Sequence, residues 1–257
     1  MTRGGHRALG VYADAFGRRA TFAAQSGGTL IDDPGLVGLQ QDDGRLNLLV
    51  VNDDAVAPLT WLLGLEPQGV IRVLPAASRC RALLEAQPGW VMTSLTAMVY
   101  RDLAAVPDVP LPESVSLRPV PLDRGRAEGS VDLVAATALL VEADPAATGA
   151  NPGRMAASLR AIRPAPQLYA AVDGSGAVRA TSGCRVFGHD ASIFFINTHH
   201  DWRRRGIGRS MTAAALRAAR LAGATCACLD ATEAGASIYL SVGFESAGPM
   251  AEFATFG

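Results

Sequence analysis

Residues 202–211, WRRRGIGRSM, place arginines and glycines shortly after an apolar run, SIFFI, at 192–196. Gly206 and Gly208 let the backbone turn tightly and let a ligand approach without interference from a Cβ atom. The unpaired N–H groups at the start of a helix, together with its dipole, favour an anion. The segment therefore predicts a phosphate-binding turn between a strand and a helix. The core-facing stripe of that helix is expected at helical spacing, at Ile207, Met211, Ala214, Ala218 and Leu221.

Two nucleotide-binding patterns fit this turn poorly. A Walker A loop needs GxxxxGK[ST], and the chain contains no lysine, since all 23 of its basic residues are arginine. The dinucleotide pattern GxGxxG finds its first two glycines here, but Met211 stands at the third. A nucleotide-cofactor protein is thus supported by GxG alone. The lack of lysine also means that the arginines carry less information than the glycine spacing.

The spacing that does fit is [RQ]xxGx[GA], read from Arg203 to Gly208, and a second segment, GASIYLSVGFES at 235–246, contains Tyr239 followed by Gly243 and Phe244. With these two motifs in this order, residues 113–257 resemble the GNAT superfamily of acyl-CoA-dependent N-acyltransferases. The resemblance implies acetyl-CoA as the cofactor, with the loop wrapped around its pyrophosphate. The implied contacts are Arg203, Arg204, Arg205, Gly206, Ile207, Gly208, Arg209 and Ser210.

The resemblance also implies a mechanism. The strand before the loop, SIFFINTHH, would splay from its parallel neighbour and bind the pantetheine arm through the backbone of Ile196, Asn197 and Thr198, and a strand N–H would stabilise the developing oxyanion. The acceptor's amine would attack directly. Tyr239 matches the position that donates a proton to the leaving thiolate, although a phenol pKa near 10 against roughly 8.5 for a thiol makes full transfer uphill.

The general base stays open at this point. The segment INTHHDW offers no glutamate, so His199, His200, Glu233 and a water molecule are all candidates. Glu233 could instead stabilise the start of its own helix. Cys226 and Cys228 share one face of a strand, where packing is the simpler expectation.

The elements that position these residues follow from periodicity and turn residues. A proline-rich stretch, 103–119, is expected to separate two domains, 1–110 and 111–257. The second domain reads as βααβββαβαββ. Its predicted strands are SVSLRPV, QLYAAVDG, VRATSGCRVFG, ASIFFINT, ATCACLD, FESAG and AEFATF, and its helices lie near 127–142, from Arg154, at 206–221 and around ASIYLSV. This order predicts a mixed α/β (α+β) fold with a mostly antiparallel sheet, flanked by helices, and one parallel crossover.

The first domain is also expected to mix helices and strands. An apolar stripe at helical spacing runs from Leu9 to Ala23, LNLLVV and VIRVL read as strands, and SRCRALLEAQ reads as a helix. The order from APLTWLLG to WVMTSLTAMVY echoes the latter part of a GNAT unit, which suggests two tandem GNAT-like units with the cofactor loop lost from the first. Such a copy could line the acceptor pocket or form a homodimer interface, and the alternative is an unrelated stabilising domain.

Composition restricts the class of protein. The chain of 257 residues is 49% hydrophobic and carries 23 basic against 24 acidic residues, so we expect no nucleic-acid or membrane partner. Its cysteines contain no CxxC pair and no histidine at metal-like spacing, so neither a zinc site nor a disulfide framework is expected. No apolar window approaches the roughly 18 residues of a membrane span, and a cytoplasmic protein is the natural interpretation.

Two function hypotheses follow. The first is an N-acetyltransferase that moves an acetyl group from acetyl-CoA to a primary amine, with a small molecule or a peptide as acceptor. The second is a non-catalytic acyl-CoA-binding sensor. The acceptor is expected to contact the segment at about 140–158 and the terminal strands.

Overall fold

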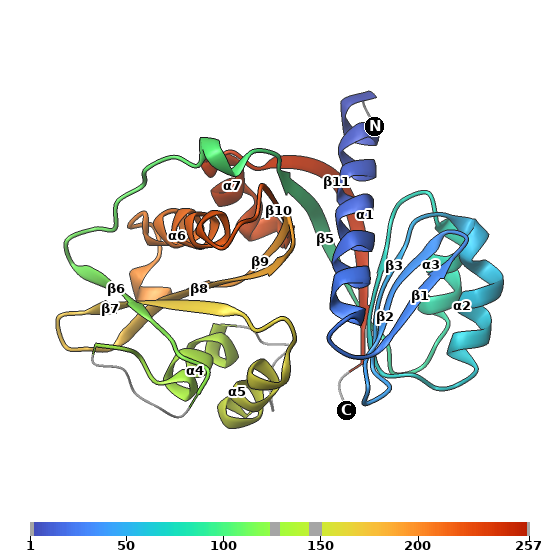
Figure 1. Ribbon diagram of the computed structural model, residues 1–257, viewed down its shortest axis with the longest axis horizontal. Coiled ribbons are helices and arrows are strands. Elements are labelled where there is room, and N and C mark those ends of the chain that lie inside the picture. Colours follow the sequence, from blue (N-terminus) through green and yellow to red (C-terminus); the bar gives the residue numbers. More distant parts are fainter. Residues whose placement is uncertain (1–2, 124–128, 144–150, 256–257) are drawn as a thin grey trace. The chain divides into compact units, whose positions relative to one another are not determined.

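The computed structural model describes residues 3–123, 129–143 and 151–255 (Figure 1). The chain forms two compact units: the first contains Met1–Val99, Asp230–Ser237 and Glu245–Gly257, and the second contains Tyr100–Leu229 and Ile238–Phe244. The chain thus changes unit at residue 99 and later returns to the first unit, whereas the sequence places one boundary at residue 110. The assignment of 1–110 as accessory and 111–257 as catalytic stays a prediction.

The first unit is a sheet with helices on both faces. Its strands lie in the order β1-β2-β3-β4-β11-β5, antiparallel except for the β3–β4 pair. Helix α1 packs against β2 and β11, while α2 and α3 cover the core formed with β3 and β4. The bounds are α1 Arg3–Ala24, β1 Thr29–Asp33, β2 Leu36–Gln40, β3 Leu46–Val50, η1 Asp53–Ala55, α2 Val56–Leu63, β4 Gly69–Val73, α3 Ser78–Glu85, β5 Val91–Tyr100 and β11 Glu245–Ala254.

Strand β11 corrects the sequence prediction at the end of the chain. FESAG and AEFATF, predicted as two strands, form this single strand, which pairs with β5 on one side and β4 on the other. The glycine and proline at 248 and 249 mark a shift of register between Ser246 and Gly248 rather than a turn. Pairing with β5 on both sides of the shift keeps this segment a single strand.

A partly buried charge cluster joins α1 to the sheet of the first unit. The Arg72 guanidinium lies 2.6 Å from Asp230 Oδ2 and 3.0 Å from Glu252 Oε2, and it donates to Asn47 Oδ1 at 2.9 Å. The Tyr12 hydroxyl donates to Asp230 Oδ1 at 2.5 Å. Burial alone would lower the pKa of Arg72, but the two carboxylates hold it above its ordinary value. The cluster, which we call the Arg72 cluster, therefore depends on one cation facing two acids.

The second unit contains the glycine loop. Its strands lie in the order β10-β9-β8-β7-β6, antiparallel except for the β9–β10 pair, which is joined through α6. The bounds are η2 Leu103–Ala105, β6 Val115–Pro119, α4 Leu133–Ala143, α5 Pro152–Ala161, β7 Gln167–Asp173, β8 Val178–Phe187, β9 Asp190–Thr198, η4 His200–Trp202, α6 Ile207–Leu221, β10 Cys226–Ala231 and α7 Glu233–Val242.

Helices cover both faces of this sheet. In Figure 1, α6 lies on one face and α4 and α5 on the other, and two separate buried clusters agree with this arrangement. Helix α4 begins later than the predicted residue 127, because Asp132 caps it by accepting the N–H groups of Val134 and Ala135. Residues 127 and 128 lie outside the described residues.

The predicted fold class is confirmed: a mixed, mostly antiparallel arrangement of strands flanked by helices, with the parallel crossover from ASIFFINT to ATCACLD. Strands β1 and β2 were absent from the prediction. The tandem origin of the first unit stays a prediction. Within the described part of the chain, no helix combines the length and the apolarity needed to cross a membrane.

Candidate functional site

The glycine loop ends at the first turn of α6, as the sequence predicts. Gly206 is the N-cap residue and has φ 80°, a left-handed conformation that favours glycine, and Arg204 is also left-handed at φ 64°. Within the described residues, the N–H groups from Arg204 to Gly208 donate to no oxygen of the chain. No heavy atom beyond the neighbouring residues lies within 4 Å of where a Cβ at Gly206 would stand. The loop therefore offers open donors to an anion.

The end of β9 lies beside this loop. A Cβ at Gly208 would stand 3.5 Å from Thr198 Oγ1 and 3.4 Å from Ile238 Cδ1, so a glycine lets the helix start approach both the strand and α7. Thr198 and the neighbouring Ile196 and Asn197 are half-buried. The structure thus brings the strand residues and the loop residues predicted from the sequence into one place.

Strand β9 leaves its parallel neighbour early. The β9–β10 register covers only Asp190 to Ser192 against Cys226 to Cys228, and no further pairing joins the two strands in the described chain. Farther along β9, Phe195 has φ 64° at a register shift against β8, where the Thr181 hydroxyl donates to the Phe195 carbonyl at 2.8 Å. The β10-facing edge of β9 beyond Ser192 is therefore left without a strand partner.

The arginines of the loop differ in their contacts. Arg203 Nε donates to the Thr198 carbonyl at 3.1 Å, and Arg205 donates to the Asp201 carbonyl at 3.1 Å while lying 4.7 Å from the centre of the Trp202 ring. The side chains of Arg204 and Arg209 are exposed and make no bond to the described residues. These two guanidinium groups are the ones available to an added anion.

Two of the predicted loop contacts point inward. The Ser210 side chain is 2% exposed, and its hydroxyl donates to the Pro110 carbonyl at 2.7 Å. Ile207 is 1% exposed and packs in the core with Met211. Any contact from Ile207 to a ligand would therefore use its backbone N–H, and the Ser210 side chain is best left out of the site because packing and a hydrogen bond already occupy it.

Tyr239 lies on α7 as a half-buried residue. Its ring packs edge-on against Phe244, with 6.0 Å between centroids, and within the described chain its hydroxyl makes no hydrogen bond. Burial raises the pKa of Tyr239 to about 12. The hydroxyl is therefore protonated at neutral pH and is available as a donor.

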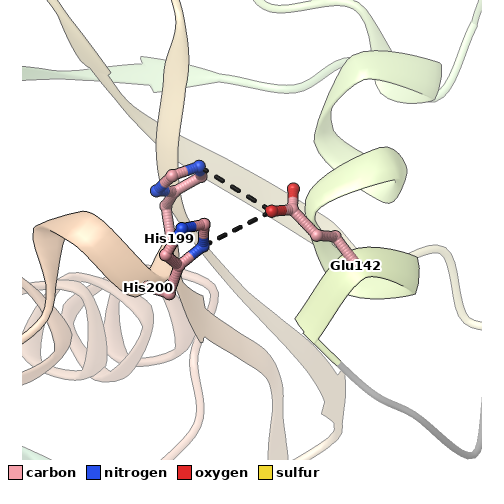
Figure 2. Close-up of side chains that lie close together, drawn as sticks. All are labelled: Glu142, His199 and His200. Atoms are coloured by element: carbon pink, nitrogen blue, oxygen red, sulfur yellow. Dashed lines mark ion pairs between the residues drawn. The ribbon is translucent and has the colours of Figure 1, made fainter.

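His199 and His200, both candidates for the base, lie together with a residue that the sequence did not indicate, Glu142 at the end of α4 (Figure 2). Glu142 Oε1 lies 3.8 Å from His199 Nε2 and 3.5 Å from His200 Nδ1. The two imidazole rings are stacked, with centroids 4.3 Å apart. Glu233, the third candidate residue, is exposed in the first turn of α7, where it stabilises the helix start.

Glu142 carried one weak signal in the sequence. It is the only charged residue of α4, LVAATALLVEA, and it continues the helix face of Ala135, Ala138 and Leu139. That face lines a groove of about 510 Å³ that also reaches Val178 and His199.

The two cysteines of β10 differ in burial. Cys228 is buried, as expected for a packing residue. Cys226 is half-buried, and its Sγ lies 3.0 Å from Asp190 Oδ1.

Comparison with known proteins shows what this part of the chain is similar to. Residues 164–246 match the model of the acetyltransferase (GNAT) domain. A GCN5-related N-acetyltransferase from Kribbella flavida has 19% identity and a TM-score of 0.64 over 96% of this chain and 95% of that one. A GCN5-related N-acetyltransferase-like protein from Streptococcus suis has 14% identity and a TM-score of 0.58, over 97% and 99%.

A third solved structure is similar over most of the chain. A tandem GNAT protein from the clavulanic acid biosynthesis pathway has 15% identity and a TM-score of 0.54 over 94% of both chains. At these identities the likenesses show the fold. No curated protein is significantly similar to this sequence.

Proposed function

Because residues 164–246 match the model of the acetyltransferase (GNAT) domain, we propose that the protein transfers an acetyl group from acetyl-CoA to a primary amine by direct attack. The observation that carries the proposal is the loop that begins α6, whose N–H groups from Arg204 to Gly208 have no partner in the described chain. A pyrophosphate would accept hydrogen bonds from such groups and would be favoured by the helix dipole. The exposed Arg204 and Arg209 would add two cations.

The residues of the second unit fit acetyl-CoA in three respects: open donors at the loop, open space at Gly206, and the unpaired edge of β9. When bound, acetyl-CoA supplies the activated thioester. Ile196, Asn197 and Thr198 would bind the pantetheine arm through their backbone, so truncation of their side chains should matter little. A backbone N–H of the same strand would stabilise negative charge on the carbonyl oxygen.

Tyr239 completes the proposed chemistry. Its hydroxyl would donate a hydrogen bond to the sulfur as the thiolate leaves. With a pKa of about 12 against roughly 8.5 for a thiol, complete proton transfer is unfavourable, and water would supply the proton. Tyr239 would thus act as a fixed hydrogen-bond donor.

Acetyl-CoA is expected to stabilise the protein. Ligand at a hundred times its Kd should raise the free energy of unfolding by about 2.7 kcal/mol, which a thermal-shift titration would detect. CoA should stabilise as well, whereas NAD and ATP should not. The absence of any shift at millimolar acetyl-CoA would contradict the proposal, and release of free thiol with a panel of amines would separate an enzyme from a binding protein.

Gly206→Val should weaken acetyl-CoA binding. A β-branched residue is strained at φ 80° and would cover the open N–H groups, so we expect Kd to rise by at least about tenfold, or about 1.4 kcal/mol. Gly223→Val is the matched control, because Gly223 has φ 98° just beyond the other end of α6 and also has open space at its Cβ position. Both variants should lose on the order of 1–2 kcal/mol of stability. Equal acetyl-CoA affinity in the two, measured by calorimetry, would show that the loop does not hold the ligand.

A further inference from the structure

Glu142, His199 and His200 form a cluster whose hydrogen-bonding pattern identifies its ligand. The three residues come from the end of α4 and from the segment after β9, and their nearest nitrogen and oxygen atoms all lie within 4.8 Å of one another (Figure 2). Such a set could hold a metal ion, a network of hydrogen bonds or a substrate cation. The positions of the protons on the two imidazole rings distinguish these possibilities.

The proton on His199 is fixed by the backbone. His199 Nδ1 accepts the N–H of Asp201 at 3.3 Å, where it caps η4. In the neutral ring the proton must then lie on Nε2, the atom that faces Glu142. A histidine that binds a metal through Nε2 needs the lone pair there and usually donates from its other nitrogen. His199 has the opposite arrangement, which disfavours a metal and favours a donor directed at the carboxylate.

His200 presents its lone pair to the same carboxylate. Its Nε2 lies 3.2 Å from Asp201 Oδ1, so the proton of the neutral ring belongs on Nε2. In this neutral form Nδ1 faces Glu142 Oε1 at 3.5 Å without a proton. Two acceptors this close can share one ligand group that has several N–H donors and lies beside them, and an ammonium has three. The proton on His199 Nε2 points toward the Glu142 carboxylate and holds its orientation.

The groove that ends at Glu142 and His199 suits the rest of such a ligand. Its walls are mainly apolar, and among the described residues that line it the charged ones are the acids Glu142 and Asp132, with no arginine. Asp132 Oδ1 accepts two N–H groups at the N-terminus of α4. Glu142 is therefore the carboxylate that the two histidines would share with a ligand. A carboxylate on the ligand would find no cation among these lining residues. The groove therefore suits an amine on an aliphatic body rather than an amino acid.

We propose that Glu142 binds the ammonium group of the acceptor and takes its proton, with His199 as a positioning residue, and that the acceptor is an aliphatic primary amine without a carboxylate. This inference rests on the proposed function. One proton passes from the ammonium to Glu142, and the freed lone pair forms the N–C bond to the thioester carbonyl. The C–S bond breaks with its electrons on sulfur. The nitrogen loses a second proton to water as the amide forms, and water supplies one proton to the thiolate. Glu142 then returns its proton to water.

The test uses two acceptors that differ only in one carboxylate, hexylamine and 6-aminohexanoate. With acetyl-CoA and the wild-type protein, kcat/KM for hexylamine should exceed that for 6-aminohexanoate by at least about tenfold, because the acid would meet only negative charge. Glu142→Gln should lower kcat/KM for hexylamine by about 100-fold, the lower end of the usual contribution of a general base. The Kd for acetyl-CoA should stay unchanged in this variant.

Asp108→Asn is the control for removal of a carboxylate. Asp108 is 97% exposed and lies 3.6 Å from Arg217, so kcat/KM should stay within about threefold of wild type. Glu142→Asp, which keeps the charge on a shorter side chain, should recover part of the activity. Equal turnover of the two acceptors, an unaffected Glu142→Gln variant, or activity that disappears with EDTA and returns with zinc would each overturn the proposal.

Binding measurements separate this inference from the proposed function. If the protein binds acetyl-CoA but turns over neither acceptor, calorimetry with hexylamine in the presence of CoA still tests the groove. Heat of binding that the wild type shows and Glu142→Gln lacks would support the amine site without acetyl transfer. No binding of hexylamine to the wild type would reject it, whatever the outcome for acetyl-CoA.

Discussion

Arg72→Ala is expected to lower the free energy of unfolding of the first unit by about 3 kcal/mol, the lower end for removing one partner of a buried ion pair. The lower end applies because the Arg72 side chain is 17% exposed. The variant leaves Asp230 and Glu252 facing each other without a cation. Hydrogen exchange of β4 and β11 would measure the loss where it arises, since these strands carry Arg72 and Glu252.

The loss should depend on pH. Burial raises the pKa of Glu252 even with Arg72 present, and without the guanidinium the rise should be larger. A carboxyl group with a raised pKa in the folded protein contributes stability at low pH that disappears as the pH rises through that pKa. The free energy of unfolding of Arg72→Ala should therefore be closest to that of wild type near pH 5 and fall furthest below it near pH 8.

Arg81→Ala provides the comparison for this variant. Arg81 pairs with Glu85 on the surface of α3, where both side chains are 48% exposed, so its removal should cost less than about 1 kcal/mol. Equal losses in the two variants, or a loss for Arg72→Ala that does not change with pH, would mean that the Arg72 cluster contributes packing rather than charge pairing.

Tyr239→Phe is expected to lower kcat by roughly 10- to 150-fold, which corresponds to about 1.5–3 kcal/mol for a hydrogen bond to a charged group. The Kd for acetyl-CoA should change little, because the bond forms with the leaving sulfur. Since burial raises the pKa of Tyr239 to about 12, the hydroxyl stays protonated between pH 6 and pH 10. The ratio of wild-type to variant kcat should therefore be constant over that range, as a pH–rate profile would show.

Tyr100→Phe is the control for this prediction. Tyr100 packs against the same Phe244 ring, with 5.3 Å between centroids, but its hydroxyl donates to the Ala105 carbonyl at 3.1 Å. Its loss should cost about 1 kcal/mol of stability and leave kcat unchanged. A ratio for Tyr239→Phe that declines above pH 9, or a similar fall in kcat for Tyr100→Phe, would contradict the role given to the Tyr239 hydroxyl.

The loop and α6 could be predicted because their determinants are local. Glycine spacing, the helical stripe from Ile207 to Ala218 and the preceding strand all lie within one segment, and the structure places them as predicted. Leu221 was wrongly predicted to face the core, because it is 83% exposed at the end of α6. Strands β1 and β2 escaped prediction, since the outer strand TLIDD is mostly exposed and lacks the alternation of a half-buried strand. Strand β11 was predicted as two strands, because its glycine and proline resemble a turn until their pairing with β5 is known.

The cluster around Glu142 could not be predicted for a different reason. Its members are separated by a helix, three strands and their connections, and only the packing of α4 beside the end of β9 brings them together. The sequence reasoning found His199 and His200 but had no means of pairing them with a distant acid. The same limit explains Ser210, whose place in the motif suggested a ligand contact while tertiary packing turned it toward Pro110.

The position of β11 between β4 and β5 has a consequence for biosynthesis. The ribosome makes β1 to β5 first, yet the sheet of the first unit lacks an interior strand until residues 245–254 emerge. Domains generally fold from the N-terminus as they are made, but here strands β1 to β5 must wait for β11. During that interval β4 and β5 each present an open edge, a state in which the nascent chain is exposed to mispairing. The second unit, made in between, can complete its own strands while the first is still unfinished.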